Sequence, residues 1–150
     1  MNVNEGKVGT YFMAGHKYEV SMKLKTNNIK ALVLRSPLLL NESSAVYILK
    51  YYPETEVMDP ETNISNVDIK TYENYQQLTY TLDVKSLGGW TPILFEAHVN
   101  DVAKAGELLL DDFVITDLTA NVEVCNEDFE GINSLRDDTV LFNFDNAAFT

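Results

Sequence analysis

The sequence has few cysteines and few basic residues, and it lacks a long apolar segment. Cys125 is the only cysteine, which excludes an intramolecular disulfide and a zinc site built from paired cysteines. With 11 Lys and Arg against 23 Asp and Glu, the formal net charge is −12. This charge argues against nucleic acid and anionic membrane surfaces as partners. Cations or neutral ligands fit it better.

No apolar run approaches the roughly 20 residues that a membrane-spanning helix needs. Met1 is followed by Asn-Val-Asn-Glu-Gly, which does not resemble a signal peptide. We therefore expect no membrane insertion. Apolar residues make up 45% of the 150 residues, a share that predicts a folded domain rather than a disordered acidic chain.

What the sequence has in quantity is apolar and polar residues in alternation, the period of a half-buried strand. Turn signals rich in Gly, Pro, Asn and Asp separate the alternating segments. The pattern predicts an all-β fold, an antiparallel β-sandwich or barrel. We expect a long irregular loop over Pro53–Tyr75 and at most one short helix near Val99–Leu108. The alternating segments are "HKYEVSMKLK", "NIKALVLRS", "SAVYILKYY", "QQLTYTLDV", "TPILFEAHVN" and "GELLLDDFVITDL".

Three segments in order, "MAGHKYEVSMKLK", "NYQQLTYTLDV" and "GELLLDDFVITDL", resemble strands of the jelly-roll carbohydrate-binding modules of bacterial xylanases and related polysaccharide hydrolases. The likeness is to the family 4, 9 and 22 group and covers about residues 8–118. It implies a galactose-binding-like jelly-roll sandwich in a protein that is secreted or held at the bacterial cell surface. In the second segment Tyr75 replaces the family's usual Trp, so we expect Tyr75 to fill the core.

The resemblance also bears on domain organisation. Family members open with "Asp-Phe-Glu" near the N-terminus, whereas here it stands at Asp128–Glu130, after the closing strand. We therefore expect residues 1–125 to form the carbohydrate-binding sandwich. Residues 126–150 either complete that sandwich beside the closing strand or begin a following module.

Adjacent acids, Asp111 and Asp112, interrupt the apolar closing strand. The resemblance implies that Asp112 ligates a structural calcium, with Asp128 or Glu130 as a partner. Calcium takes six to eight oxygen ligands, mainly from carboxylates and carbonyls. Neighbouring strand residues point to opposite faces, so Asp111 and Asp112 cannot both face one ion in an unbroken strand. The alternative is that Asp112 accepts backbone hydrogen bonds at a bulge and no metal is bound.

Sugar sites pair an exposed aromatic ring with carboxylate, amide or guanidinium groups. We expect Tyr47 and Tyr51 to share the solvent face of one strand, with Tyr52 toward the core. The resemblance to family 22 favours Glu96 in the ligand groove. The other candidates share a predicted solvent-facing or loop position, and they are Arg35, Gln77, Trp90 and His98.

The sequence contains no recognisable catalytic motif, because the "GxSxG", phosphate-loop and "HExxH" patterns are all missing. The resemblance instead implies a non-catalytic module that binds plant cell-wall polysaccharide, xylan first and mixed-linkage β-glucan next. Such a module tethers a catalytic domain of the same polypeptide to its substrate. The alternative is a jelly-roll spacer or protein-docking domain without a sugar site.

Overall fold

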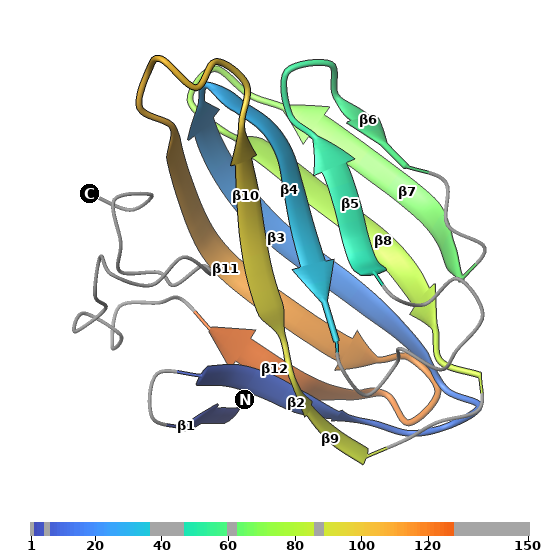
Figure 1. Cartoon of the computed structure of the whole chain (residues 1–150). Helices are drawn as coiled ribbons and strands as arrows, with labels where there is room; N and C mark the ends of the chain where they lie inside the picture. The colour runs from blue at the N-terminus through green and yellow to red at the C-terminus, as the bar shows by residue number, and fades with distance from the viewer. Residues whose placement is uncertain (1, 5–6, 37–46, 60–62, 86–88, 128–150) are drawn as a thin grey trace.

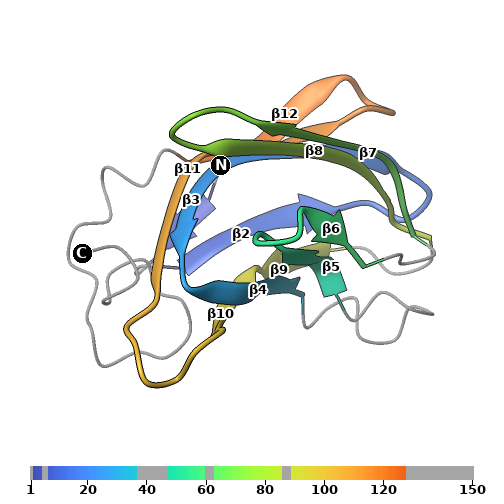
Figure 2. The same ribbon diagram turned by 90° about the horizontal axis from the view of Figure 1, so that it is seen from above.

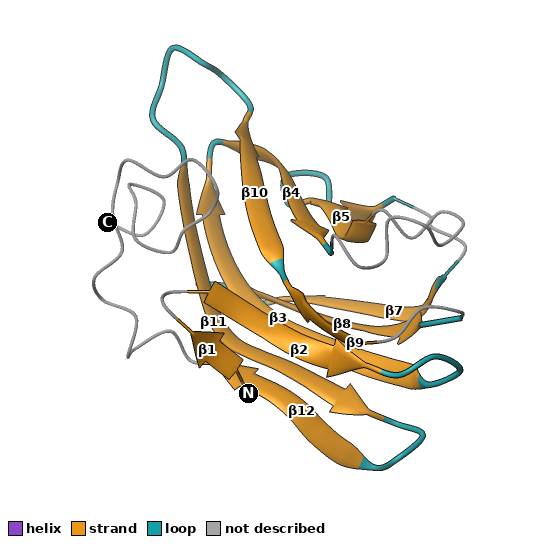
Figure 3. Cartoon of the chain, turned by 60° about the horizontal axis from the view of Figure 1, so that its bottom comes forward, coloured by secondary structure: helices purple, strands orange, loops and turns teal. Residues whose placement is uncertain are grey.

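A computed structural model describes residues 2–4, 7–36, 47–59, 63–85 and 89–127, and all the regular structure in them is β-strand (Figures 1 and 3). A five-stranded sheet has the order β12-β11-β3-β8-β7. Its strands, in that order, are Val122–Glu127, Glu107–Asp117, Lys17–Asn27, Gln76–Asp83 and Ile64–Thr71. A four-stranded sheet has the order β10-β4-β5-β6, formed by Leu94–Val99, Ile29–Arg35, Tyr47–Tyr52 and Val57–Met58.

A third sheet, β1-β2-β9, consists of Asn2–Asn4, Lys7–Phe12 and Gly89–Pro92. All the strand pairs are antiparallel. Viewed from above, the five-stranded sheet forms one layer and the four-stranded sheet faces it (Figure 2). The expected all-β antiparallel sandwich is therefore confirmed, whereas the finer jelly-roll assignment stays a prediction.

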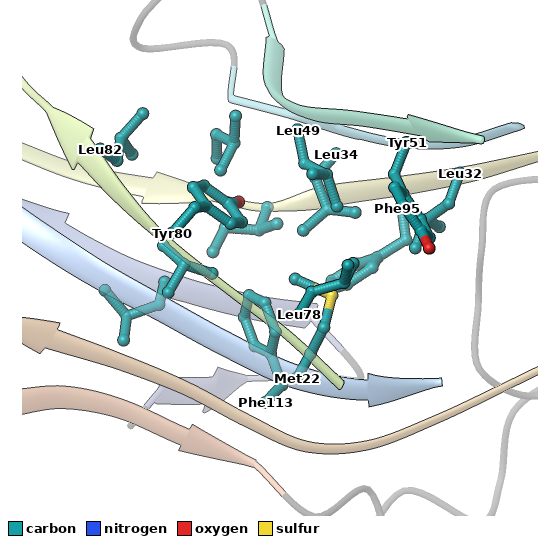
Figure 4. Close-up of a cluster of buried hydrophobic side chains, with 14 of the residues drawn as sticks. Met22, Leu32, Leu34, Leu49, Tyr51, Leu78, Tyr80, Leu82, Phe95 and Phe113 are labelled. Atoms are coloured by element: carbon teal, nitrogen blue, oxygen red, sulfur yellow. The ribbon is translucent and has the colours of Figure 1, made fainter. Parts of the chain in front are cut away.

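The core lies between the two layers, and it follows the alternation of the sequence (Figure 4). In β3, Tyr18, Val20, Met22 and Leu24 are buried, while the residues between them face outward. Leu32 and Leu34 of β4 point into the same core from the facing sheet. The predicted inner faces of β3, β4 and β8 are thus confirmed. The inner residues of β8 and the following turn are Leu78, Tyr80, Leu82 and Val84.

The prediction of a long irregular loop over Pro53–Tyr75 is wrong, because this segment contains β6 and β7. β7 is the outermost described strand of its sheet and is exposed or half-buried along its whole length. A strand with little buried surface has no need of apolar alternation, so this segment carries no period-two pattern. A register shift between Ser65 and Asp68 and a positive φ of 53° at Asn66 interrupt its pairing with β8.

The prediction of a short helix near Val99–Leu108 is also wrong. β10 and β11 cover the ends of that segment, and residues 100–106 form turns. The side chain of Asn28, in the β3–β4 turn, is hydrogen-bonded to the segment that connects β10 with β11. Its side-chain amide donates to the carbonyls of Asp101, Lys104 and Ala105 at 3.0, 3.1 and 3.2 Å. Its Oδ1 accepts from the Asp101 N–H at 2.9 Å. These bonds satisfy backbone groups that a helix would otherwise have paired.

β12 continues past residue 125 and pairs with the closing strand β11, matching Ile115 with Cys125 and Phe113 with Glu127. Thr10 of β2 donates from its hydroxyl to the Val124 carbonyl at 3.2 Å, which connects β12 with the three-stranded sheet. Asp128–Glu130 and the rest of 128–150 lie outside the described residues. The described part of the chain contains no apolar helix long enough to cross a membrane.

Candidate functional site

Three of the predicted ligand-binding residues meet on the outer face of the four-stranded sheet. Glu96 Oε1 lies 2.7 Å from His98 Nε2 and 3.4 Å from Arg35 Nη2. Strand register brings them together: His98 and Glu96 alternate along β10, and Arg35 lies on the neighbouring strand β4. The side chains are partly exposed, at 25% for Glu96, 40% for Arg35 and 51% for His98. Charged and polar groups are thus presented to solvent in a fixed arrangement.

A hollow of about 260 Å³ lies on this same face. Val33 of β4 pairs with Glu96 on one side and with Lys50 of β5 on the other, so the three residues form one row across three strands. Because neighbouring strands lie about 4.8 Å apart, the backbones of Glu96 and Lys50 are roughly 10 Å apart. We call this site the sheet hollow, and its lining consists of Lys30, Ala31, Val33, Arg35, Lys50, Tyr52 and His98.

Tyr52 is the aromatic residue of the sheet hollow. Its hydroxyl donates to Asp59 Oδ2 at 3.1 Å, and Lys50 Nζ lies 3.6 Å from the same oxygen. The ring is therefore fixed at one end while the residue remains partly exposed. With Ala31 and Val33 as an apolar floor, one aromatic residue and charged groups around them, the sheet hollow offers apolar and polar contacts within one shallow surface.

The solvent-facing position predicted for Tyr51 is wrong, and so is the inward position of Tyr52. Tyr51 is fully buried with Leu49, and its hydroxyl donates to Gln76 Oε1 at 2.9 Å across the core. Burial, and then the charge of Glu56, raise the pKa of Tyr51 to about 12. Aromatic and aliphatic residues occupy both faces of "YILKYY", so alternation alone could not tell the inner face from the outer one.

The remaining predicted ligand residues do not join the sheet hollow. Gln77 lies on the five-stranded sheet, opposite Lys23. Trp90 lies in β9, where its ring covers Gly9 so closely that a Cβ there would be 2.5 Å from Trp90 Cζ2. For Tyr47 the backbone pairs with Arg35, but its side chain lies outside the described part of the structure. The predicted residues are therefore divided among three sheets.

The two acids of the closing strand lie at a β-bulge, where the pairing of β11 with β3 shifts between Asp111 and Val114. Asp112 has a positive φ of 50°, and its N–H donates to Asp111 Oδ1 at 2.8 Å. Both carboxylates are exposed, and Asp112 Oδ2 lies 3.1 Å from Lys23 Nζ. The hydrogen bond and charge of Asp112 raise the pKa of Lys23. The pair is tolerated because the bulge turns both side chains toward water and a cation.

The calcium ligands expected from the sequence are only partly within the described residues. Among them, no three His, Cys, Asp or Glu side chains come close enough to hold a metal ion. Asp112 is paired with Lys23, and the other expected ligands, Asp128 and Glu130, lie beyond the described residues. A calcium site at Asp112 stays a prediction that depends on those two residues.

Sequence reasoning missed Lys50 and Tyr52 as lining residues of the sheet hollow and Asp59 as their partner, and it placed Tyr75 in the core. Tyr75 is instead half-buried on the outer face of the five-stranded sheet, where it stacks on Tyr72. The signal for Lys50 and Tyr52 was present, because they alternate with the core residues Leu49 and Tyr51. Finding these two residues required only the correct assignment of which face of β5 is buried.

Comparisons of the chain with profiles of protein families, with curated proteins and with solved structures found no match.

Proposed function

We propose that the chain is a non-catalytic carbohydrate-binding module that binds plant cell-wall polysaccharide through the sheet hollow. The observation that carries this proposal is that Arg35 and His98, both bonded to Glu96, line one hollow together with Tyr52. Sugars present an apolar face to aromatic rings and a rim of hydroxyls to charged and amide groups. The sheet hollow offers both kinds of contact within one shallow surface.

The ligand we propose is an internal segment of xylan, followed in preference by mixed-linkage β-glucan. A hollow that is open on a sheet surface accommodates a chain that continues in both directions, whereas an enclosed pocket selects chain ends. The module then tethers an attached glycoside hydrolase to its substrate and raises its effective concentration there. Secretion or display on the bacterial surface follows from this role.

The alternative is a structural spacer or protein-docking domain with no sugar site. One observation favours it: the polar groups of the sheet hollow already have partners within the chain. Glu96 is engaged by Arg35 and His98, and Asp59 by Tyr52 and Lys50. A ligand would have to compete for some of these contacts.

Affinity electrophoresis separates the two functions. We expect native gels that contain xylan or mixed-linkage β-glucan to retard the protein, and gels that contain mannan to retard it less. Tyr52→Ala and Glu96→Gln should each weaken xylan retardation, with the effect on binding at the sheet hollow about tenfold. Tyr11→Ala is the matched control, because Tyr11 is 60% exposed on β2 and lies outside the hollow.

Retardation on none of the polysaccharides would favour the spacer. Retardation that Tyr52→Ala and Glu96→Gln leave unchanged would move the site away from the sheet hollow. Calcium is tested separately by the melting temperature in calcium and in excess chelator. Equal melting temperatures would rule against a structural ion.

A further inference from the structure

A stacked aromatic pair lies at the end of the five-stranded sheet. Tyr72 and Tyr75 close the β7–β8 hairpin, where the Tyr72 N–H donates to the Tyr75 carbonyl at 2.8 Å. Their ring centroids are 4.8 Å apart and the ring planes are inclined by 28°. Tyr72 is 45% exposed, so one of the two rings offers substantial surface to solvent. We call these two residues the tyrosine pair.

The tyrosine pair is held from both sides. On the outer face, Lys23 Nζ lies 5.3 Å from the centre of the Tyr75 ring while it also pairs with Asp112. On the inner side, the neighbouring Gln76 accepts from the buried Tyr51 hydroxyl and donates to the Pro53 carbonyl at 3.2 Å. A ring that is already fixed loses little conformational freedom when a ligand binds to it.

Two adjoining hollows surround the pair. One, of about 240 Å³, is lined by both tyrosines and by Glu73, Asn74 and Gln76, with the end of β3 on its other side. The second, of about 290 Å³, extends from Tyr75 to Leu109 and Asp111. Both are lined by Lys25, Asn74 and Tyr75, so they adjoin at these residues, and we call the two hollows together the track. Each lies below or near the roughly 300 Å³ at which enclosed ligand pockets begin. The track therefore suits successive units of a chain better than one enclosed molecule.

The charges along this track are mixed. Lys23 and Lys25 contribute positive charge, Asp111 and Glu73 contribute negative charge, and Asp112 pairs with Lys23 beside the track. An anionic or cationic polymer would meet repulsion along part of such a surface. A neutral, hydroxyl-rich ligand can instead donate to the carboxylates and accept from the ammonium groups. The exposed aromatic ring supplies the apolar contact that the face of a pyranose needs.

We propose that the tyrosine pair and its track form a second carbohydrate-binding surface, which takes a neutral β-linked pyranoside chain. Lys23, Lys25 and Asp111 of the track lie on the outer face of the five-stranded sheet. The four-stranded sheet, whose outer face carries the sheet hollow, lies on the opposite side of the core, and Figure 2 shows the two sheets as facing layers. This inference rests on the proposed function for the nature of the ligand. Its new consequence is that one module binds two separate chains and connects them, which a single-faced tether does not do.

Nuclear magnetic resonance titration with xylohexaose tests the two surfaces independently. We expect two groups of backbone amide signals to shift, one from Ala31, Val33 and Lys50 and one from Tyr72, Asn74 and Gln77. Tyr72→Ala should remove the second group or weaken its affinity about tenfold, and leave the first unchanged. Tyr52→Ala should do the reverse. Asn74→Ala, which keeps both rings, is the second variant, and Tyr11→Ala is the control.

A bulk measurement supplements the titration. Wild-type protein mixed with soluble xylan should form a turbid, cross-linked suspension, while Tyr72→Ala and Tyr52→Ala should each bind xylan without turbidity. Shifts confined to the sheet hollow would overturn the second surface and leave the proposed function standing. Shifts confined to the tyrosine pair would overturn the sheet hollow as a sugar site and the connection of two chains, and would leave the tyrosine pair as the single carbohydrate-binding surface. No shift with xylohexaose or a mixed-linkage glucan hexasaccharide would overturn both proposals.

Discussion

His16 Nδ1 lies 2.7 Å from Asp117 Oδ2, and this contact joins two elements that are 101 residues apart in the sequence. Asp117 is buried at the end of β11, and its other oxygen accepts from the Ala120 N–H at 2.8 Å. Burial by itself raises the pKa of Asp117. The hydrogen bonds from Ala120, His16 and Thr119, together with the charge of His16, outweigh burial, so the pKa lies below its ordinary value.

Stability should therefore depend on the ionisation of Asp117. Its folded-state pKa is lower than that of the unfolded chain, so the stabilisation is present at neutral pH. It should begin to disappear as the pH falls through the unfolded value of about 4 and be gone below the folded value. Asp117→Asn should lower the free energy of unfolding by about 2 kcal/mol at pH 7. Urea unfolding at pH 7 and pH 3 checks this, and an equal loss at both values would contradict it.

Removing the hydroxyl of two buried tyrosines should change the free energy of unfolding in opposite directions. Tyr51 donates to Gln76, so Tyr51→Phe should lower the free energy of unfolding by about 1 kcal/mol. The Tyr80 hydroxyl is fully buried and has no hydrogen-bond partner among the described residues. Tyr80→Phe should therefore raise stability by about 1 kcal/mol. Chemical denaturation of the two variants measures both signs.

The bulge at Asp112 can be tested through its backbone. A φ of 50° is costly for any residue with a Cβ and costs glycine nothing. Asp112→Gly should therefore be about 1 kcal/mol more stable than Asp112→Ala. Both variants lose the exposed pair with Lys23, so the comparison isolates the backbone. Thermal unfolding of the two proteins measures the difference, and equal melting temperatures would mean that the strand relaxes at the bulge.

Gly9 should tolerate no side chain. A Cβ there would lie 2.5 Å from Trp90 Cζ2 and 2.6 Å from the Thr91 carbonyl oxygen, which belongs to the backbone and cannot rotate away. Gly9→Ala should cost about 1–3 kcal/mol and displace the Trp90 ring. Because Trp90 is the only tryptophan, its fluorescence maximum reports the displacement directly. Gly15→Ala is the control, since Gly15 has a positive φ but nothing within 4 Å, and it should leave the emission unchanged.

The layers of this fold could be predicted from the sequence wherever one strand face is buried and the other is wet. β3 is the clearest case, because Tyr18, Val20, Met22 and Leu24 alternate with polar residues. β7 could not be predicted, since a strand with little buried surface carries no apolar period. In β5 the pattern gave the strand but not its orientation, because both faces carry large side chains.

The site could be predicted only in part for a related reason. Arg35, Glu96 and His98 were found because each is polar on a strand with an unambiguous core face. Their meeting required the register between β4 and β10, which no single strand encodes. The tyrosine pair was missed because both residues lie in the hairpin turn, where strand alternation no longer assigns a face.

The broken pairing of β7 has a consequence under the proposed function, in which many copies gather along one polymer. A flat outer strand would offer its backbone to the next copy and seed growth of a continuous intermolecular sheet. The shift between Ser65 and Asp68, the left-handed Asn66 and the charged pair of Asp68 and Lys70 spoil such a template. Copies at high local concentration can therefore meet at this edge and still behave as separate molecules.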